Sequence, residues 1–396
     1  MNEPSSNQPR VAEWLAHIRF LTVDIGPRGA TRPGERKGHE YARDCFEKMG
    51  LKPVWETYSA ALSNFHPHLL GAVLMLLAFV LFPLFGVGSM VLAALLSILV
   101  VVSELQELGA LNNLFRMVVP RGQSQNVFAV IPPAGEHQRD LVVIGHVDTQ
   151  RTALIFRTRA WVNAYNLFIM IAFITFLLQM ALFTLAAIFG WAWAWYVCIP
   201  TAICAVLLGF ITAQPEFTPY TAGANDNASA VGMVLALAKE LSQQPLEHTR
   251  VYAVVSGCEE VQHYGAIDFY KRHRGEMKDP QALVFEMIGC AGPAWELQEG
   301  IIVPFKSDPG LRATCERLAA AHPEWKAYPT QVSGGNSEMA DSLRAKVPAI
   351  CLFGVRQNGE IPYWHQVGDT FDKMDPEVME RTWAFTRALV DEIDRG

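Results

Sequence analysis

Acidic residues and histidines recur beside short apolar segments of this 396-residue chain. His146 and Asp148 follow one apolar segment in the stretch IGHVDT, and Glu259 and Glu260 follow another in SGCEEV. Glu286 lies inside the apolar stretch LVFEMIG, where an unpaired carboxylate would be costly to bury. Imidazole nitrogens and carboxylate oxygens are ligands that suit Zn²⁺ and related ions. These residues therefore suggest a metal site.

Two further segments extend this set. Asp226 stands in GANDNASA, and His365 stands in YWHQVGDT, which also contains Asp369. Each residue alone has an ordinary explanation, since an aspartate in such a segment often caps a helix and a Glu-Glu pair often lies at a helix N-terminus. All of them together, in five segments spread along the chain, are better explained by a metal site.

The adjacent pair Glu259-Glu260 and the spacing of His146 and Asp148 indicate how these residues divide the chemistry. Of two adjacent carboxylates, one can bind a metal while the other stays free as a base. Asp148 is two residues from His146, on the same face of a strand, so we expect it to orient the imidazole. Asp148 is therefore a candidate catalytic residue beside Glu259.

The composition indicates membrane content and excludes a nucleic-acid partner. Only 18% of the residues are charged and 51% are hydrophobic, whereas soluble domains have about 25% charged residues. The net charge is −7, and no block of lysines and arginines offsets it. The seven cysteines are scattered, so we expect no disulfide framework and a reducing compartment. The first twenty residues lack an apolar core, so no signal peptide is expected.

Two long apolar regions without Asp, Glu, Lys or Arg interrupt the chain. They run from Leu69 to Val102, with Pro83 near the middle, and from Val162 to Ala213, with a break at Gly190. A membrane-spanning helix needs about 20 apolar residues. The second region supplies two such helices, whereas the first supplies two of roughly 16 residues, or about 24 Å each. We therefore predict two transmembrane hairpins, at 66–102 and 161–213, with a re-entrant hairpin as the alternative for the first.

The flanks of these hairpins carry arginines, and the turns carry no charge, which predicts that the flanks and the polar remainder face the cytoplasm. The arginines are Arg116, Arg121, Arg151, Arg157 and Arg159. Strand-like and helix-like segments alternate through the remainder, so residues 1–65, 103–160 and 214–396 are predicted to form one α/β domain with a mixed central sheet flanked by helices. Within it, NVFAVIP is expected to pair antiparallel with LVVIGHVDT through the intervening Pro-Pro-Ala-Gly turn.

The series of motifs resembles the M28 family of zinc aminopeptidases over nearly the whole chain outside the hairpins. The most specific parts are GANDNAS, at 223–229, and GCEE, at 257–260. The resemblance implies a zinc-aminopeptidase-like fold and two zinc ions, with Glu259 as the general base. It also implies the ligands: Asp226 would bridge the ions, with His146 and Glu286 completing one site and Glu260 and His365 the other.

Two positions depart from the family pattern. The family often has aspartate where this chain has Glu286, and it often has Ser-Asp-His where this chain has NSEMADSL, with Glu338 and Met339. The substrate pocket is therefore expected to differ from that of an ordinary aminopeptidase. Some relatives are glutaminyl cyclases, and others have lost their metals and act as receptors or scaffolds.

The resemblance implies cleavage of an amide bond by a water molecule that two metals activate. Both hairpins are expected to leave the sheet at the edge that carries the ligands, because ligands bind beyond the carboxyl ends of strands in α/β sheets. The expected partners are thus the lipid bilayer and a small amphiphilic or peptide substrate, such as a lipo-amino acid, an aminoacyl lipid or a lipopeptide. The alternatives are a membrane-anchored aminopeptidase acting on short peptides and a metal-free membrane scaffold. The sequence gives no indication of the oligomeric state.

Overall fold

The computed structural model describes residues 4–109, 113–300, 303–332 and 335–396. The chain divides into two compact units. The sheet unit comprises Met1–Ala60, Gly122–Arg151 and Tyr220–Gly396, and the helical unit comprises Ala61–Arg121 and Thr152–Pro219. Each unit is built from segments that are far apart in the sequence, because the two parts of the helical unit are inserted into the sheet unit.

An eight-stranded sheet in the order β1-β2-β4-β3-β5-β10-β6-β9 forms the centre of the sheet unit. The strands β4, β3, β5 and β10 are parallel, whereas β2 is antiparallel to β4 and β6 is antiparallel to β10. The mixed central sheet flanked by helices is the predicted fold class. The strands, including the small pair β7 and β8, are β1 Val54–Ala61, β2 Arg121–Ile131, β3 Arg139–His146, β4 Thr249–Ser256, β5 Pro280–Glu286, β6 Ala294–Glu296, β7 Gln298–Glu299, β8 Phe305–Lys306, β9 Tyr328–Thr330 and β10 Ala349–Phe353.

The predicted pairing of NVFAVIP with LVVIGHVDT is wrong, because β4 lies between β2 and β3. Val127 of β2 is opposite Val255 of β4, and Val143 of β3 is opposite Ala253 of the same strand. The Pro-Pro-Ala-Gly segment therefore joins two strands that are not neighbours. Since β2 runs antiparallel to the parallel strands, its start still lies at their carboxyl edge.

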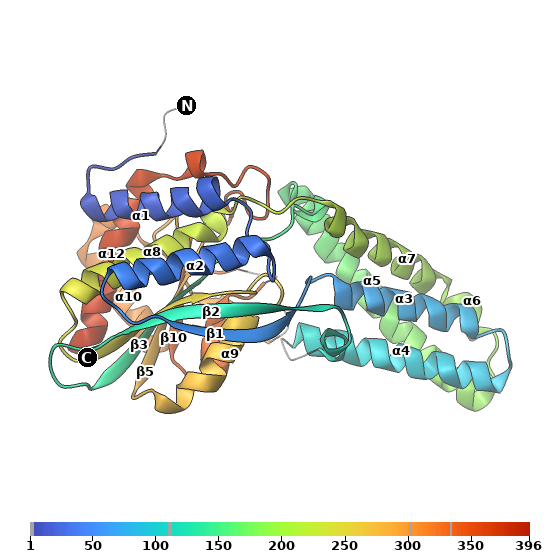
Figure 1. The fold of residues 1–396 in the computed structure, drawn as a ribbon. Coiled ribbons are helices and arrows are strands. Elements are labelled where there is room, and N and C mark those ends of the chain that lie inside the picture. Colours follow the sequence, from blue (N-terminus) through green and yellow to red (C-terminus); the bar gives the residue numbers. More distant parts are fainter. Residues whose placement is uncertain (1–3, 110–112, 301–302, 333–334) are drawn as a thin grey trace. The chain divides into compact units, whose positions relative to one another are not determined.

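Helices cover both faces of the sheet, and the strands alternate their side chains between two cores. Val143 and Leu283 face the larger core with α1, α2, α8, α10 and α12, whereas Ile144 and Val284 face the smaller core with α9 and α11. Figure 1 shows α1, α2, α8 and α12 on one side of the strands and α9 on the other. The helices are α1 Pro9–Arg19, α2 Pro33–Lys48, α8 Ser229–Gln243, α9 Tyr264–His273, α10 Pro309–Ala321, α11 Glu338–Arg344 and α12 Pro376–Arg395.

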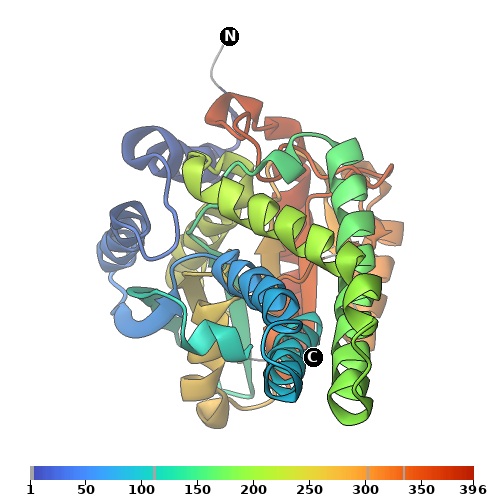
Figure 2. The ribbon, with the colours of Figure 1, turned by 90° about the vertical axis from the view of Figure 1, so that its right-hand side faces the viewer.

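Four main helices form the helical unit: α3 His66–Leu81, α4 Val87–Leu108, α5 Arg159–Phe189 and α7 Ile199–Ala213, with the short α6 Ala194–Val197 between the last two. Within this unit, α3 packs against α4 and α7, and α5 packs against α4 and α7. Figure 2 shows α3 and α4 in blue and cyan and α5 and α7 in green. Gly190 ends α5 in the left-handed conformation, at the predicted break.

Among the described residues, three helices are long and apolar enough to cross a membrane: Val87–Leu108, Arg159–Phe189 and Ile199–Phe217. The helix His66–Leu81 is apolar but has 16 residues, which matches the short length expected in the first hairpin. Its partner α4 is longer than expected because it continues past Val102 to Leu108, through Glu104 and Glu107. Three spans are thus supported, and the fourth stays a prediction.

Candidate metal centre

The predicted ligands meet at the carboxyl edge of the parallel strands. His146 is the last residue of β3, and Glu286 is the last residue of β5. Glu260 follows β4, and His365 follows β10. Asp226 comes from the irregular segment before α8, between Gly223, which has a positive φ, and the start of the helix. All five residues belong to the sheet unit, and the fold brings them together although they span most of the chain.

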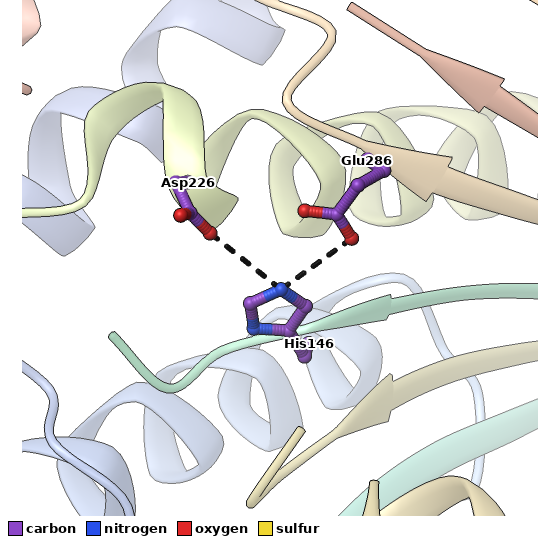
Figure 3. A group of neighbouring side chains, drawn as sticks. All are labelled: His146, Asp226 and Glu286. Atoms are coloured by element: carbon purple, nitrogen blue, oxygen red, sulfur yellow. Dashed lines mark ion pairs between the residues drawn. The ribbon is translucent and has the colours of Figure 1, made fainter. Parts of the chain in front are cut away.

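His146, Asp226 and Glu286 form the first group of potential ligands. The Nε2 atom of His146 lies 3.7 Å from Asp226 Oδ1 and 3.5 Å from Glu286 Oε2. Figure 3 shows the imidazole pointing between the two carboxylates. This nitrogen is buried and makes no hydrogen bond with any described residue. A buried polar atom without a hydrogen bond needs an explanation, and a bound cation would provide one.

Asp226, Glu260 and His365 form the second group. The Nε2 atom of His365 lies 3.3 Å from Asp226 Oδ2 and 3.2 Å from Glu260 Oε2. Asp226 thus directs Oδ1 toward one histidine and Oδ2 toward the other. A carboxylate placed in this way is able to bridge two cations.

The distances within each group fit zinc. Zinc bonds of about 2.0–2.1 Å in tetrahedral geometry place neighbouring ligand atoms about 3.4 Å apart. The four separations between each histidine nitrogen and its carboxylate oxygens are 3.2–3.7 Å, close to this value. The donor set of imidazole and carboxylate suits zinc as well. The residues that are present therefore fit the metal that the sequence predicts.

The electrostatics of the site also favour a bound cation. Burial raises the pKa of Glu260 to about 8, and it raises the pKa of Asp226 and Glu259 well above their usual ranges. Neighbouring carboxylates, among them Glu286, contribute to all three of these shifts. Without a cation, these groups cannot all be ionised near neutral pH. A divalent cation would supply the missing charge.

Glu259, the candidate base, lies beside the first group without belonging to it. Its Oε2 atom is 3.6 Å from His146 Nε2, and its Oε1 atom is 3.2 Å from His263 Nε2. The other ring nitrogen of His263 lies 2.6 Å from Asp341 Oδ2. Burial lowers the pKa of His263, but Asp341 and Glu259 outweigh this effect and raise it to about 10. The imidazolium therefore holds one oxygen of Glu259 and leaves the other directed toward the ligands.

Asp148 lies beside His146, as expected, and it also holds the Glu-Glu segment. Its Oδ1 and Oδ2 atoms accept hydrogen bonds from the backbone N–H groups of Glu259 and Glu260, each at 3.1 Å. The Nδ1 atom of His146 lies 3.1 Å from the Asp148 carbonyl oxygen and 3.5 Å from its carboxylate. Asp148 therefore mainly fixes the Glu-Glu segment, and its main-chain oxygen lies closest to the imidazole.

Asp369 has the same function for the Asp226 segment. Its Oδ1 and Oδ2 atoms accept hydrogen bonds from the N–H groups of Asn225 and Asp226, at 2.7 and 3.0 Å. Asn227 donates from Nδ2 to Glu286 Oε2 at 3.0 Å. Hydrogen bonds to ligands and to their backbones orient metal sites, so these residues prepare the carboxylates for a cation.

Sequence reasoning missed several residues that surround the site. Asp341 and Glu338 are buried in α11, in the stretch NSEMADSL that departs from the family pattern. Burial raises the pKa of Glu338 to about 7. Neither His263 nor Arg28 was among the predicted site residues. The only signal for Asp341 was the departure from the family pattern itself.

The sheet and the two ligand groups define the class of a metallopeptidase-like α/β hydrolase. Residues 209–390 match the family model described as Peptidase family M28. The M28 resemblance predicted from the sequence is confirmed by this match, which covers the part of the chain that contains four of the five predicted ligands. No curated protein sequence matches the chain significantly.

Solved structures with the same fold include two aminopeptidases and a glutaminyl cyclase. The leucine aminopeptidase precursor of Bacteroides thetaiotaomicron is 11% identical with a TM-score of 0.56, covering 98% of both chains. The zinc aminopeptidase of Bacillus subtilis is 11% identical with a TM-score of 0.57, covering 99% of this chain and 96% of that one. The glutaminyl cyclase of B. thetaiotaomicron, bound to N-acetylhistamine, is 12% identical with a TM-score of 0.57, covering 98% and 99%. The predicted fold class is confirmed.

Proposed function

We propose that this protein is a membrane-bound, zinc-dependent amidohydrolase or aminopeptidase that cleaves an amide bond of an amphiphilic substrate. The observation that carries the proposal is the position of Asp226 between two histidines, one facing each of its oxygens. Glu259 beside this arrangement supplies the base. The M28 match and the zinc aminopeptidases of the same fold agree with the reaction class.

Two zinc ions are proposed, with His146 and Glu286 at one, Glu260 and His365 at the other, and Asp226 shared. Zinc bound there would polarise the scissile carbonyl and lower the pKa of the attacking water. The buried carboxylates of Asp226, Glu260 and Glu286 and the largely buried carboxylate of Glu259 surround the site. One divalent ion would leave much of this negative charge uncompensated, so the charge balance supports two.

Glu259 would take a proton from the attacking water and pass it to the leaving amine. General acid–base catalysis of this kind requires a carboxylate that is near the reacting atoms and is not itself a ligand. His263 and Asp341 hold Glu259 in one orientation. The products would be a free amine or amino acid and a shortened acyl partner.

The helical unit supports membrane attachment, and the connections within the sheet unit support a substrate drawn from the bilayer. The second inserted segment begins shortly after Asp148 and ends shortly before Asp226. The first ends at the start of β2, which lies at the carboxyl edge of the sheet. The chain thus passes to the helical unit from the edge that carries the ligands. The proposed location is the membrane, with the sheet unit on the cytoplasmic side.

The test compares wild type with Glu259→Gln, each incubated in liposomes with an extract of membrane lipids and peptides. Mass spectrometry would follow released amines and amino acids, and elemental analysis would measure zinc. We expect products that have gained one water only with wild type, and a loss of about 100- to 10,000-fold in the variant. The variant should bind as much zinc as wild type, because Glu259 is not a proposed ligand.

Other outcomes would identify the alternatives. Loss of ammonia from an N-terminal glutamine, without addition of water, would indicate the reaction of the glutaminyl cyclases that share the fold. Trimming of soluble peptides alone would leave the helices as an anchor. If neither protein binds zinc and the extract has the same composition after incubation with wild type and with Glu259→Gln, the proposal is contradicted and a metal-free membrane scaffold is favoured.

A further inference from the structure

Arg28 is a fully buried arginine in the loop between α1 and α2, outside the segment that matches the M28 family model. Its relative exposure is 0%, which is unusual because arginine is rarely buried without partners. Asp369, Asp148 and Asp226 raise its pKa, but burial outweighs them and lowers it to about 10, so Arg28 remains charged at neutral pH. A buried cation that costs this much to desolvate must be held by specific contacts.

Backbone carbonyl groups from three separate segments accept the hydrogen bonds of this guanidinium. The Nε atom donates to Val147 O at 2.8 Å. The Nη1 atom donates to Leu21 O and Ala222 O at 2.8 Å each, and the Nη2 atom donates to Gly223 O at 2.8 Å. One side chain therefore connects three segments: the residues that follow α1, the residues that follow β3 and the segment that leads to Asp226.

The backbone of Arg28 is fixed in the same place. Its N–H group donates to Thr149 Oγ1 at 3.0 Å, and its carbonyl oxygen accepts from Thr149 N–H at 3.2 Å. The guanidinium also needs the small residue at position 223. A Cβ atom on Gly223 would lie 2.9 Å from Arg28 Nη2 and 2.3 Å from Thr149 Cγ2. The packing around Arg28 thus leaves little freedom for either segment.

The two segments that Arg28 joins carry ligands of both groups. Val147 stands between His146 and Asp148, and Asp148 in turn holds the backbone of the Glu-Glu segment. Gly223 shortly precedes Asp226. The same two segments are the ends of the sheet unit between which residues 152–219 are inserted. Arg28 therefore fixes the separation of His146 and Asp226 although a long helical insertion lies between them in the chain.

Arginine is suited to this position for a chemical reason. Its planar guanidinium presents five N–H donors in a fixed fork, whereas a lysine ammonium has three donors on a flexible stem. Lysine would keep the charge but would leave some of the carbonyl groups from Val147, Leu21, Ala222 and Gly223 without donors. The two segments would then be free to move relative to each other.

We propose that Arg28 is a positioning residue that sets the zinc affinity of the site by fixing the His146 segment relative to the Asp226 segment. The proposal rests on the zinc binding of the proposed function. It goes beyond that function because it assigns the geometry of the ligands to a residue that is neither a ligand nor a catalytic residue. A merely structural arginine would stabilise the fold without affecting how tightly the folded protein binds zinc.

The matched control is Arg116, a second buried arginine, which belongs to the helical unit. It is 1% exposed, and its guanidinium donates to Glu107 Oε2 at 3.1 Å and to Asn64 Oδ1 at 2.7 Å. The variants Arg28→Lys and Arg116→Lys make the same chemical change at equal burial. Both should lower the thermal stability of the zinc-free protein, because each leaves buried acceptors without donors.

The experiment uses the full chain in detergent with zinc as the only ligand. Zinc affinity is measured by competition with a chelator, and the unfolding temperature is measured with and without zinc. We expect Arg28→Lys to weaken zinc binding by about 10- to 100-fold, as for other residues that orient ligands, and to reduce the stabilisation by zinc. We expect Arg116→Lys to bind zinc as wild type does.

Equal zinc affinity in Arg28→Lys and wild type would overturn the proposal, whatever the change in stability. If Arg28→Lys does not fold, Thr149→Val replaces it, because this isosteric change removes one acceptor that holds Arg28. A several-fold loss of zinc affinity would then support the proposal, and an unchanged affinity would overturn it. A wild-type protein that binds no zinc would instead contradict the proposed function. The variants test only the proposal about Arg28.

Discussion

Both units bury pairs of charged and polar residues in direct contact, but the candidate metal site of the sheet unit is arranged differently. In the helical unit, such residues contact one another directly: Arg116 contacts Glu107 at 2.5 Å, and His68 contacts Glu104 at 2.9 Å. In the sheet unit, Nε2 of His146 faces three carboxylate oxygens at 3.5–3.7 Å and makes no hydrogen bond with a described residue. The first pattern is that of closed pairs, and the second is that of ligands arranged around a common point.

This difference helps to distinguish buried polar groups that only stabilise the fold from buried polar groups that could bind a ligand. In a closed pair, the two charges neutralise each other, so no further cation is needed. Carboxylates and histidines that approach without touching remain uncompensated until a cation binds. The separation of the groups therefore distinguishes the two cases better than burial does, because Arg116 and His146 are equally buried, each at 1% exposure.

The largest expected effect comes from replacing the shared carboxylate of the candidate metal site, and a carboxylate of the helical unit serves as the comparison. Asp226→Asn removes the ligand that both groups share, so zinc content and hydrolysis should fall to background. Glu107→Gln weakens a closed pair in the helical unit, so it should lower the unfolding temperature and leave zinc content unchanged. Elemental analysis and the mass-spectrometric assay check both variants. If both variants retained equal zinc, the distinction between the two kinds of burial would fail.

A smaller effect is expected from replacing His263, which pairs with Asp341 through one ring nitrogen and contacts Glu259 through the other. His263→Leu removes the ion pair with Glu259, in which the imidazolium lies within hydrogen-bonding distance of the carboxylate, while Asp341 stays in place. Hydrogen bonds to charged groups are worth about 1.5–3 kcal/mol, so kcat should fall by about 10- to 100-fold. KM and zinc content should change little, because His263 is not a ligand. His263→Gln keeps a donor and should recover part of kcat, whereas equal losses in both variants would contradict this function of His263.

Much of the site could be predicted because each ligand lies in a short motif of its own. His146, Asp226 and Glu260 stand in segments whose residue types indicate metal binding without knowledge of the fold. Arg28 could not be predicted, because its loop of glycines and prolines gives no sign of burial. His263 and Asp341 could not be paired, because only the packing of α9 against α11 brings them together.

The fold shows the same division between local and long-range information. The apolar regions predicted the helices of the helical unit, because length and composition decide such elements locally. The position of β4 between β2 and β3 was missed, since adjacency in a sheet depends on pairing between distant segments. The short strands β6 to β9 were not assigned either, because two- and three-residue strands leave little periodicity in the sequence. The helices α10 and α11 were also not assigned.

His17 tests whether a buried histidine of the sheet unit outside the site behaves as a neutral core residue. Burial and, to a smaller extent, the charge of Lys239 lower its pKa from 6.5 to about 4. The unfolded chain therefore binds the proton first, so stability is lost as the pH falls from 6.5 and the loss levels off below 4. This shift corresponds to about 3 kcal/mol.

His17→Gln should remove that part of the acid sensitivity while it keeps an acceptor for the hydroxyl group of Tyr41, which lies 2.7 Å from His17 Nδ1. Thermal unfolding of both proteins at pH 7 and pH 4.5 provides the comparison. Wild type should lose more stability than the variant between the two values. Parallel losses would mean that His17 is not buried in its neutral form.

The smallest effect is expected inside the helical unit. Gln179 is fully buried and donates from Nε2 to Met75 O at 3.1 Å and to Ser97 Oγ at 3.3 Å. Gln179→Leu should lower stability by about 1 kcal/mol, because the net contribution of a buried hydrogen bond is worth about that much. Thermal unfolding in detergent measures the change, with the exposed Leu178→Ala as the control. A loss of zinc in Gln179→Leu would show that the two kinds of polar burial are not independent.

The most direct test of the central claim is anomalous diffraction at the zinc absorption edge from crystals of the full chain. The account predicts two peaks, one between His146, Asp226 and Glu286 and one between Asp226, Glu260 and His365, about 3.5–4 Å apart. Crystals of folded protein grown with zinc that show no peak at either position would contradict it.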